Sequence, residues 1–488
     1  MPDLGRPAVD GPVRMSIGGQ WCAAADGAVF PASDPATGEQ LADIPDAGRA
    51  DVDRAVAAAT DASRAWGRLA QRERTRLLLE LAARLRGKAE RLAWLEAVDA
   101  GIPLATARAD VTRGIERLEY FANIAVELQG RTYPAQHERL IMTIPEPYGV
   151  IAVINPFNHP FMFALSKVAA PLAVGNAVVM KPPQQAALSS VELMHDVHEV
   201  LPAGVLNLLT GLGGTGAALT EHPGIGRISF TGSVPTGQAI LAAAAKNVTP
   251  VVLELGGKNA NIVFPDADLA NAVKWTVSGM SLGVCGQSCQ SGTRLFLHED
   301  VYDVFLGRLA DRLSQVRIGL PVDEKTQMGP LITAEHWARV KSYVDGAQAD
   351  GARLLTGGTR PGETELAGGH FLRPTVLTEV KPAMTVAREE IFGPVLSVIR
   401  WRDRDEMLAA VNGLPYGMTA SVFSRSLDVL STVREIDAGY IYLNKHGGSD
   451  PGVPFGGWKH SGIGIEHSFE ELLEYTRTRT VAGYLQTS

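Results

Sequence analysis

The chain has 488 residues, of which 45% are hydrophobic and 20% are charged, a composition typical of a globular protein with more than one domain. Its net charge of −8 and the lack of a basic run argue against nucleic-acid binding, and no apolar stretch is long enough for a membrane span. The three cysteines are too few for a disulfide scaffold, and residues 1–10 carry no apolar secretory signal, so we expect a cytoplasmic protein with no membrane partner.

The N-terminal part is predicted to be helical after a loose tail over the first residues. Two helices are expected, over Ala50–Ala70 and Arg72–Val98. In the second, leucines recur at helical spacing, with arginine and glutamate on the other faces. Gly101 follows this pattern as a stop.

From Tyr148 onward, short runs of β-branched residues alternate with helical stretches, which indicates βαβ units and a parallel sheet. The expected strands are Val150–Ile154, Ala177–Lys181, Val205–Leu209, Ile228–Thr231 and Val251–Leu255, and the expected helices between them are Ala164–Leu172 and Val191–Leu201. A second α/β series extends from about Ala260 to Tyr442. It includes strands at Ile262–Phe264, Leu372–Leu377 and Val395–Ile399 and a helix at Val301–Val316.

Two further segments alternate like strands but belong to neither series. They are Arg131–Pro147 and Arg477–Tyr484. One interpretation is that they pair into a small projecting sheet, whose exposed edge would need a partner. The alternative is two ordinary edge strands, and the pattern does not decide between them.

Cys289 and Glu254 are the residues that point most directly to chemistry. Cys289 lies in Gly286-Gln287-Ser288-Cys289, and Glu254 lies in Leu253-Glu254-Leu255-Gly256-Gly257. A thiolate attacks a carbonyl carbon, and a carboxylate activates the water that later releases the acyl group. For an isolated pair, a buried cysteine and a strand-ending glutamate would be the simpler interpretation.

Two glycine-rich turns favour a nucleotide cofactor. Gly211–Gly216 matches the pattern GxGxxG between an expected strand and a helical stretch, although a chain with 51 glycines gives such matches by chance. Phe230–Gly237 is a second strand-to-helix turn, whose backbone N–H groups are suited to a pyrophosphate.

Several motifs follow one another in a fixed order. They are Pro156-Phe157-Asn158-His159-Pro160, Val178-Val179-Met180-Lys181-Pro182, Phe230-Thr231-Gly232-Ser233, Glu254-Leu255-Gly256-Gly257-Lys258, Gly286-Gln287-Ser288-Cys289, Glu389-Glu390-Ile391-Phe392-Gly393-Pro394 and Pro454-Phe455-Gly456-Gly457. Together, from about Gly18 to Val481, they resemble the aldehyde dehydrogenase superfamily.

The resemblance implies catalytic roles for three residues. Cys289 is the expected nucleophile, Asn158 the expected oxyanion donor, and Glu254 the expected base that activates water, which places the chain in the hydrolytic branch. Two rival classes stay open: a cysteine hydrolase without nicotinamide, and a non-catalytic relative. No metal site is expected.

The resemblance also implies a cofactor, NAD or NADP. Lys181 is expected at the adenosine ribose, Glu390 at the nicotinamide ribose with Phe392 beside the ring, and Gly232 and Ser233 at the pyrophosphate. Gln184 stands where NAD-preferring relatives commonly have glutamate, so it leaves the choice of cofactor open. The remaining expected cofactor residues are Ile154, Pro156, Phe157, Gly211, Gly216, Phe230, Gly237 (which is expected to allow close helix packing) and Leu255.

Departures from the family pattern concern the substrate. His159, Ser166, Gly283 and Ser449 replace positions that are often aromatic, with Lys445 and His446 nearby, and they predict a wider, more polar tunnel. Together with Ser288 and Phe455, they form the expected substrate site for a small-molecule aldehyde that is larger than the short aliphatic ones.

The fold class implied is α/β, with a Rossmann-like parallel-sheet cofactor domain, an α/β catalytic domain and a small bridging β-sheet. We assign residues 1–130 and 148–255 to the cofactor-binding domain, 256–450 to the catalytic domain, and 131–147 and 475–488 to the bridging strands. By resemblance, the protein is expected to be a homodimer or homotetramer.

Overall fold

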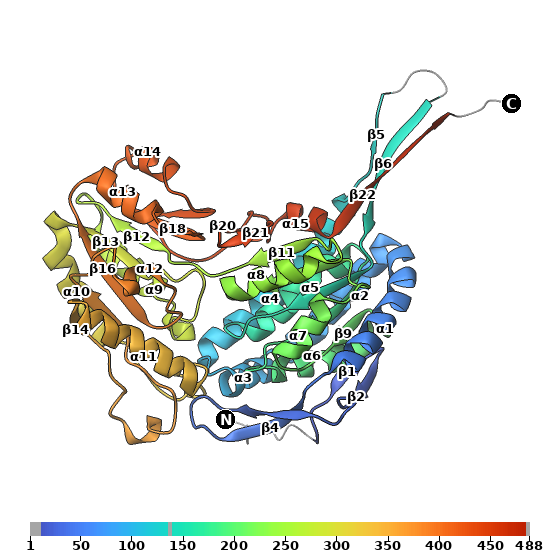
Figure 1. Cartoon of the computed structure of the whole chain (residues 1–488), viewed down its shortest axis with the longest axis horizontal. Coiled ribbons are helices and arrows are strands. Elements are labelled where there is room, and N and C mark those ends of the chain that lie inside the picture. Colours follow the sequence, from blue (N-terminus) through green and yellow to red (C-terminus); the bar gives the residue numbers. More distant parts are fainter. Residues whose placement is uncertain (1–10, 135–138, 485–488) are drawn as a thin grey trace.

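The computed structural model describes residues 11–134 and 139–484, and it places two α/β bodies side by side with a narrow arm projecting from one of them (Figure 1). The expected tail over residues 1–10 lies outside the described residues. The expected fold class is confirmed.

The first body is built on an eight-stranded sheet with a parallel centre. Its strand order is β2-β1-β9-β8-β7-β10-β11-β21. The five strands from β9 to β11 run parallel, whereas β1, β2 and β21 are antiparallel to their neighbours. The bounds are β1 Met15–Ile17, β2 Gln20–Cys22, β7 Val150–Ile154, β8 Ala177–Lys181, β9 Leu206–Leu208, β10 Arg227–Thr231, β11 Val251–Glu254 and β21 Gly462–Ile463.

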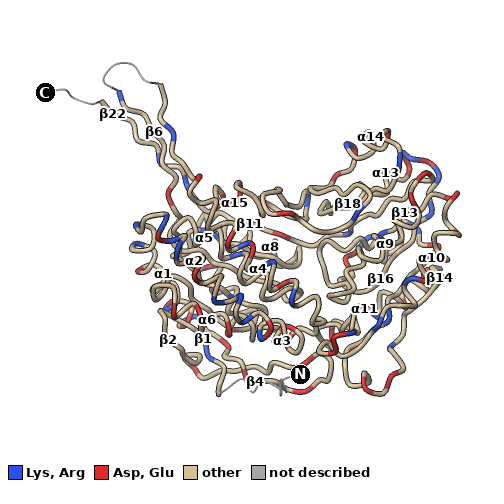
Figure 2. Tube along the Cα trace, turned by 180° about the vertical axis from the view of Figure 1, so that it is seen from behind, with Lys and Arg blue, Asp and Glu red and all other residues tan. Residues whose placement is uncertain are grey.

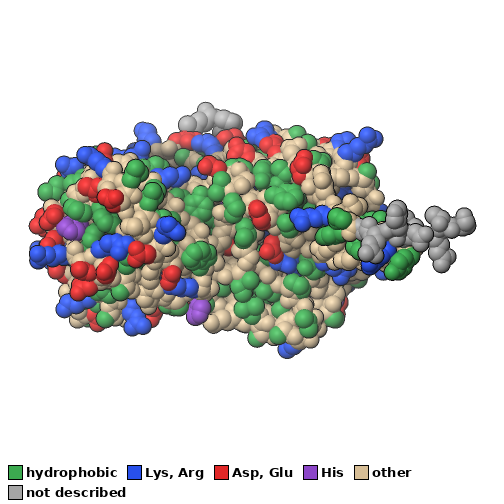
Figure 3. All heavy atoms as spheres, turned by 90° about the horizontal axis from the view of Figure 1, so that it is seen from above, with side chains coloured by type: hydrophobic (Ala, Val, Ile, Leu, Met, Phe, Trp, Pro, Cys, Tyr) green, Lys and Arg blue, Asp and Glu red, His purple; other side chains and the backbone are tan. Residues whose placement is uncertain are grey.

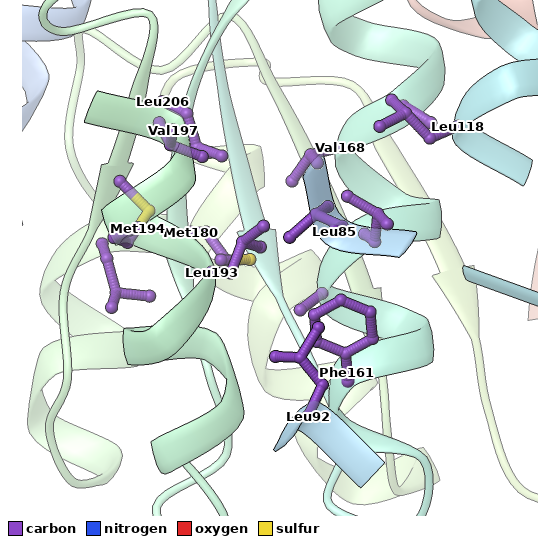
Figure 4. Close-up of a cluster of buried hydrophobic side chains, with 14 of the residues drawn as sticks. Leu85, Leu92, Leu118, Phe161, Val168, Met180, Leu193, Met194, Val197 and Leu206 are labelled. Carbon is purple, nitrogen blue, oxygen red and sulfur yellow. The ribbon is translucent and has the colours of Figure 1, made fainter. Parts of the chain in front are cut away.

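Helices cover this sheet and supply most of its core. They are α1 Arg49–Arg68, α2 Gln71–Gly87, α3 Ala89–Asp99, α4 Leu104–Ile124, α5 Pro160–Ala173, α6 Leu188–Val200, α7 Gly213–Thr220 and α8 Val234–Ala245. Figure 4 shows part of the core, where Leu85, Leu118 and Phe161 come from α2, α4 and α5 and point toward one another. Burial of such apolar side chains is the main driving force for this packing.

The prediction of one helix over Arg72–Val98 is wrong. The helix breaks at Lys88, whose backbone leaves helical geometry at φ −111° and ψ 12°, so that α2 and α3 are separate. The Lys88 ammonium lies 2.8 Å from the buried carboxylate of Asp196 on α6, which fixes the break against a neighbouring helix. The leucine periodicity continues across the break, so this periodicity does not indicate where α2 ends.

The second body has a seven-stranded sheet, in the order β14-β15-β16-β13-β12-β18-β19, with only β14 antiparallel. Its core is a separate apolar cluster drawn from residues 260–438. The strands are β12 Ala260–Val263, β13 Arg294–His298, β14 Arg353–Thr356, β15 Thr375–Thr378, β16 Val395–Trp401, β18 Thr419–Phe423 and β19 Tyr440–Leu443, and the longer helices are α9 Leu269–Gly279, α10 Tyr302–Ser314, α11 Ala334–Ala349 and α13 Arg404–Asn412.

Two segments tie the bodies together, and neither was foreseen. The first is the hairpin of β3 (Val29–Ser33) and β4 (Gln40–Pro45). Ala36, in the turn between these strands, packs with Leu366 and Phe371 of the second body. After residue 450 the chain returns to the first body, where β21 pairs with β11 and the short helix α15 (Phe469–Glu474) buries Leu472 in the first core. The residue pattern in these segments does not indicate which part of the chain each one contacts.

The two alternating segments pair with each other, as one interpretation predicted. β22 (Thr476–Tyr484) runs antiparallel to β6 (Arg139–Pro147) over its full length, and β5 (Arg131–Thr132) adds the third strand. This sheet forms the projecting arm in Figure 1. The part of the predicted segment over 485–488 lies outside the described residues.

Acidic and basic residues are interleaved along both bodies, as Figure 2 shows, so the trace carries no extended region of one sign. Within residues 11–134 and 139–484, the helices include none with the length and apolar character needed to cross a bilayer. The same residues contain no cluster of histidine, cysteine and carboxylate side chains that could hold a metal ion.

Candidate active site

A cavity of about 1050 Å³ lies at the carboxyl ends of the parallel strands of the first sheet and reaches the second body. Its wall includes residues that directly follow β7, β8, β10 and β11, which is where ligands bind in open α/β sheets. Cys289, Glu254 and Asn158 all line it, although they lie far apart in the sequence and Cys289 comes from the second body. The structure therefore brings the three expected catalytic residues together.

Cys289 lies in a tight loop that the sequence around it is built to form. The loop follows a short 3-10 helix, and Gly286 adopts φ 71°, where a Cβ would come 2.3 Å from the backbone of Gly393. Only glycine fits this position. The Asn259 side-chain amide donates to the Cys289 carbonyl oxygen at 2.7 Å and holds the loop against the second sheet.

The surroundings of Cys289 favour the protonated form of its thiol. Burial raises its pKa to about 12, and the nearby carboxyl groups of Glu254 and Glu390 raise it further, while Lys167 acts in the opposite direction. An ordinary free cysteine has a pKa of about 8.5. Nucleophilic attack by this thiol thus requires a proton acceptor or added positive charge.

Glu254 ends β11 and is 3% exposed. Burial raises its pKa well above the usual range, Glu466 and Glu471 raise it further, and Lys167 lowers it. Neither carboxyl oxygen has a hydrogen-bond partner with good geometry among the described residues, although the backbone N–H of Gly457 lies close enough to favour the charged form. A carboxyl group in such surroundings is suited to accept a proton at neutral to alkaline pH.

Asn158 follows β7 and is 5% exposed on the cavity wall. Its side-chain amide makes no hydrogen bond to any described residue, so it is available for a group in the cavity. Asn158 lies in the turn between β7 and α5. Helix α5 begins at Pro160, and proline is favoured at the first position of a helix.

Most of the expected cofactor residues form the wall of the same cavity. They are Ile154, Pro156, Phe157, Lys181, Gln184, Gly216, Phe230, Gly232, Ser233, Leu255, Glu390 and Phe392. Ser233 is the N-cap of α8, where its hydroxyl accepts a hydrogen bond from the Thr236 N–H at 3.4 Å. The neighbouring N–H groups of the first turn form a site with positive character.

Lys181 is buried and Glu390 is half-buried, and both line the cavity. Burial lowers the pKa of Lys181 to about 8, against the opposing effect of Asp46. Burial raises the pKa of Glu390, whose carboxylate accepts a hydrogen bond from the Gly257 N–H at 3.0 Å. Phe392 packs edge-on against Phe157, with ring centroids 5.7 Å apart.

Two glycines expected to bind the cofactor do not lie on the cavity wall. The space beside Gly211 is filled by its own loop, because a Cβ at this position would come 2.0 Å from the Thr215 hydroxyl. Gly237 lies beneath Leu255, where a Cβ would come 2.7 Å from the leucine methyl. Gly237 thus permits the close helix packing that was expected of it, and Gly213 lines the cavity in place of Gly211.

Sequence reasoning missed the contribution of α11. His336, Arg339 and Tyr343 of this helix line the cavity, and the His336 ring lies 2.7 Å from the Phe392 carbonyl oxygen. Their spacing places them on one helix face, but nothing in the sequence distinguishes that face from an ordinary solvated one. The buried ion pair of Lys167 with Glu466 was also not predicted. A lysine inside the apolar sequence of α5 indicates that a buried acidic partner is needed.

The expected substrate residues lie outside this cavity wall, and three of them contact α4. The His159 ring lies 2.6 Å from the Asp110 carboxylate, the Ser449 hydroxyl accepts from Arg117 at 3.1 Å, and Gly283 faces Thr106. The other three are Ser166, which is buried without a partner for its hydroxyl, Ser288, which accepts from the Gln290 N–H at 3.3 Å, and Phe455, which stacks on His467. Helix α4 was not assigned to the site from sequence.

Two details bear on the expectation of a wide, polar tunnel, which stays a prediction. A Cβ on Gly283 would lie 2.6 Å from the Thr106 hydroxyl, so α4 fills part of the space that the missing aromatic side chain leaves. His446 is buried and engaged with the Gln290 carbonyl oxygen at 2.9 Å and the Ser421 hydroxyl at 2.7 Å. It braces the nucleophile loop and is not a free donor for a substrate.

Comparison with known proteins agrees with this geometry. The model of the aldehyde dehydrogenase family matches residues 21–481. The chain belongs to the aldehyde dehydrogenase family. Among solved structures, a protein from Burkholderia cenocepacia named as an aldehyde dehydrogenase is 41% identical, with a TM-score of 0.94 over 96% of this chain and 97% of that one.

Two further solved structures are similar to this chain over almost their whole length. PnpE from Pseudomonas sp. WBC-3 is 38% identical, with a TM-score of 0.95 over 98% of this chain and 99% of that one. Betaine aldehyde dehydrogenase from Staphylococcus aureus, solved in complex with NAD+, is 32% identical, with a TM-score of 0.94 over 98% and 96%.

Proposed function

We propose that this protein oxidises an aldehyde to a carboxylic acid, with NAD or NADP as the acceptor. The observation that carries the proposal is the shared cavity wall, on which Cys289, Glu254 and Asn158 meet residues suited to a dinucleotide. Family membership supports oxidation of an aldehyde.

In the first step, the Cys289 sulfur adds to the aldehyde carbon and the thiol proton ends on the carbonyl oxygen, which gives a thiohemiacetal. The Asn158 amide, with the backbone N–H of Cys289, stabilises the negative charge that develops on this oxygen. One such donor contributes about 3 kcal/mol to the transition state. Asn158 is buried and Cys289 is half-buried, so few water molecules compete for the charge.

NAD or NADP, when bound, would supply the acceptor for the hydride of the thiohemiacetal carbon; loss of this hydride and of the hydroxyl proton to solvent leaves a thioester on Cys289. Glu254 then takes a proton from the water that attacks the thioester carbon. The carboxylic acid leaves, and Cys289 regains its thiol. The raised pKa of Glu254 makes it a stronger base than an exposed carboxylate once it is ionised.

The cavity residues fit a dinucleotide. The buried Lys181 provides donors for ribose hydroxyls, Glu390 provides an acceptor, and the first turn of α8 at Ser233 suits a pyrophosphate. The Staphylococcus aureus relative binds NAD+. Gln184 lines the cavity without a negative charge, so we include NADP as a usable acceptor.

We also propose a homodimer or homotetramer in the cytoplasm. Strand β22 forms an edge of the arm, and its outer edge has no partner among the described residues. Apolar side chains that are about half exposed lie near it in the chain, including Trp458, Ile463 and Leu473, and Figure 3 shows apolar patches on the face that carries these elements. An unpaired edge beside apolar patches is suited to a second subunit, and the three free cysteines suit a reducing compartment.

The test is a screen of purified protein with aldehydes of different size and charge, in which NADH or NADPH absorbance is followed with each cofactor. We expect aldehyde-dependent reduction of at least one cofactor, and loss of this activity in Cys289→Ala with cofactor binding retained. Ester hydrolysis that needs no nicotinamide, without any cofactor reduction, would instead favour a cysteine hydrolase.

A further inference from the structure

Arg117 on α4 is a cation without a contacting anion. Its Nη1 donates to the Nε2 of His467, and its Nη2 donates to the Ser449 hydroxyl at 3.1 Å and lies 3.3 Å from the Nδ1 of His467; both partners are neutral groups. Burial and the guanidinium itself hold the pKa of His467 well below its usual range, so the ring stays uncharged. No carboxylate among the described residues lies within ion-pair distance of Arg117.

The carboxylates near Arg117 are already engaged elsewhere. Glu466 pairs with Lys167, and Glu471 accepts a hydrogen bond from the His467 backbone N–H at 2.6 Å. Asp110 lies 2.6 Å from the His159 ring and 3.1 Å from Arg113. They act on Arg117 through space only, and its guanidinium keeps donors to spare because it offers five N–H groups.

A purely structural arginine looks different in this protein. Arg294 is buried, and its three side-chain nitrogens donate to the backbone carbonyls of Lys258, Ala410 and Val411 at 2.8 to 3.0 Å. Arg117 has no carbonyl acceptor, and no hydrogen bond from its Nε to a described residue. A hydroxyl and an imidazole are weak substitutes for an anion, and a partly buried charge without an anion is costly.

The position of Arg117 links it to the substrate side of the site. It lies on the helix whose residues Thr106 and Asp110 face Gly283 and His159, and Asn158 directly precedes His159. Its partner His467 stacks on Phe455, with centroids 5.2 Å apart and an interplanar angle of 20°. Thus a group bound to Arg117 would lie among the expected substrate residues, away from the nucleotide cavity.

We propose that Arg117, together with the Ser449 hydroxyl, binds a carboxylate on the substrate, so that the preferred aldehyde carries a second, anionic end. The inference rests on the proposed function. A guanidinium matches a carboxylate with two parallel hydrogen bonds, a stronger pairing than its two terminal nitrogens now make with the neutral side chains of His467 and Ser449. The stack of the His467 ring on Phe455 holds the imidazole in place beside the guanidinium.

The test compares aldehydes that differ only in this charge. The pairs are 4-carboxybenzaldehyde against 4-formylbenzamide, and succinic semialdehyde against 4-oxobutanamide, so that one short and one long spacing are sampled. We expect the wild-type kcat/KM to favour the acid by about tenfold or more in at least one pair. In Arg117→Gln this ratio should fall by about tenfold, mainly through KM for the acid.

Matched variants separate the anchor from general charge and from folding. Arg84→Gln removes an exposed arginine whose carboxylate partner is also exposed, and should leave the acid-to-amide ratio unchanged. Arg117→Lys keeps the charge without the fork and should give an intermediate ratio; if Arg117→Gln does not fold, this variant and the wild-type ratio decide. An equal wild-type rate on acid and amide, or an unchanged ratio in Arg117→Gln, overturns the anchor, whereas no aldehyde oxidation at all overturns the proposed function.

Discussion

The carboxyl group of Glu254 raises the pKa of the Cys289 thiol, although the two residues belong to different bodies of the protein. Both side chains line the same cavity, and burial alone already disfavours the ionised form of each. A negative charge on one group therefore makes ionisation of the other harder. The pair is suited to act in sequence, with the thiol first and the carboxylate afterwards.

Replacement of Glu254 by glutamine should separate the two halves of the reaction. The acyl group should still form on Cys289, but hydrolysis should be slow, so a burst of NADH or NADPH approaching one per active site should precede slow turnover. Stopped-flow absorbance measures the burst, and Glu80→Gln, an exposed glutamate on α2, is the control. Full steady-state turnover in Glu254→Gln would rule out its role as the essential base.

Activity should rise with pH above neutrality. The pKa of Cys289 is raised to about 12 and that of Glu254 is also raised above its usual range, so the reactive, ionised forms of both groups increase as pH rises. Because Lys167 lowers both pKa values, Lys167→Met should move the rising part of the kcat profile to higher pH. Lys274→Met, at an exposed position, should not move it. A flat profile between pH 6.5 and 9.5 would contradict this account.

Gln184 should allow appreciable use of NADP. A carboxylate at this position would repel a 2′-phosphate, so Gln184→Glu should shift the NAD-to-NADP ratio of kcat/KM toward NAD by about tenfold or more. Gln185→Glu tests the adjacent position, which also lines the cavity, and should change the ratio less. If the wild type uses no NADP, or the ratio stays the same in Gln184→Glu, steric exclusion elsewhere governs the choice.

Removal of residues 480–488 should weaken assembly. The deletion takes away the half of β22 that pairs Thr480 with Thr143 and Tyr484 with Arg139, and it shortens the free edge of the arm. Sedimentation velocity at low concentration should then show a smaller species or loss of soluble protein. Truncation after residue 484 keeps the whole of β22 and is the matched control; an unchanged mass in the longer deletion would dismiss the arm as an interface.

Ser166→Trp should restrict the substrate site. Ser166 is 4% exposed, and its hydroxyl has no partner among the described residues, so a large ring must displace neighbours or fill adjacent space. We expect kcat/KM to fall more for a large polar aldehyde than for acetaldehyde, and the wild type to prefer the larger aldehyde over acetaldehyde and hexanal. Best wild-type activity on short unsubstituted aldehydes would refute this.

The sequence by itself determined the fold class, the parallel strands of the first sheet, three strands of the second sheet, and many of the residues that meet at the cavity. These features depend on local signals, because buried parallel strands need short apolar runs and tight turns before a helix need glycine or an N-cap residue. Cys289, Glu254 and Asn158 were predicted from motifs, and the structure places all three on one wall.

Only the tertiary structure decided which distant groups act on those residues. The return of the chain after residue 450 brings Glu466 and Glu471 close to Glu254, and α4 brings Arg117 to Ser449. Neither segment carries a pattern that reveals its neighbours, because pairing across the chain depends on how the two bodies pack. For the same reason, Gly211 matched a nucleotide motif yet lies off the cavity wall, where its loop already fills the space.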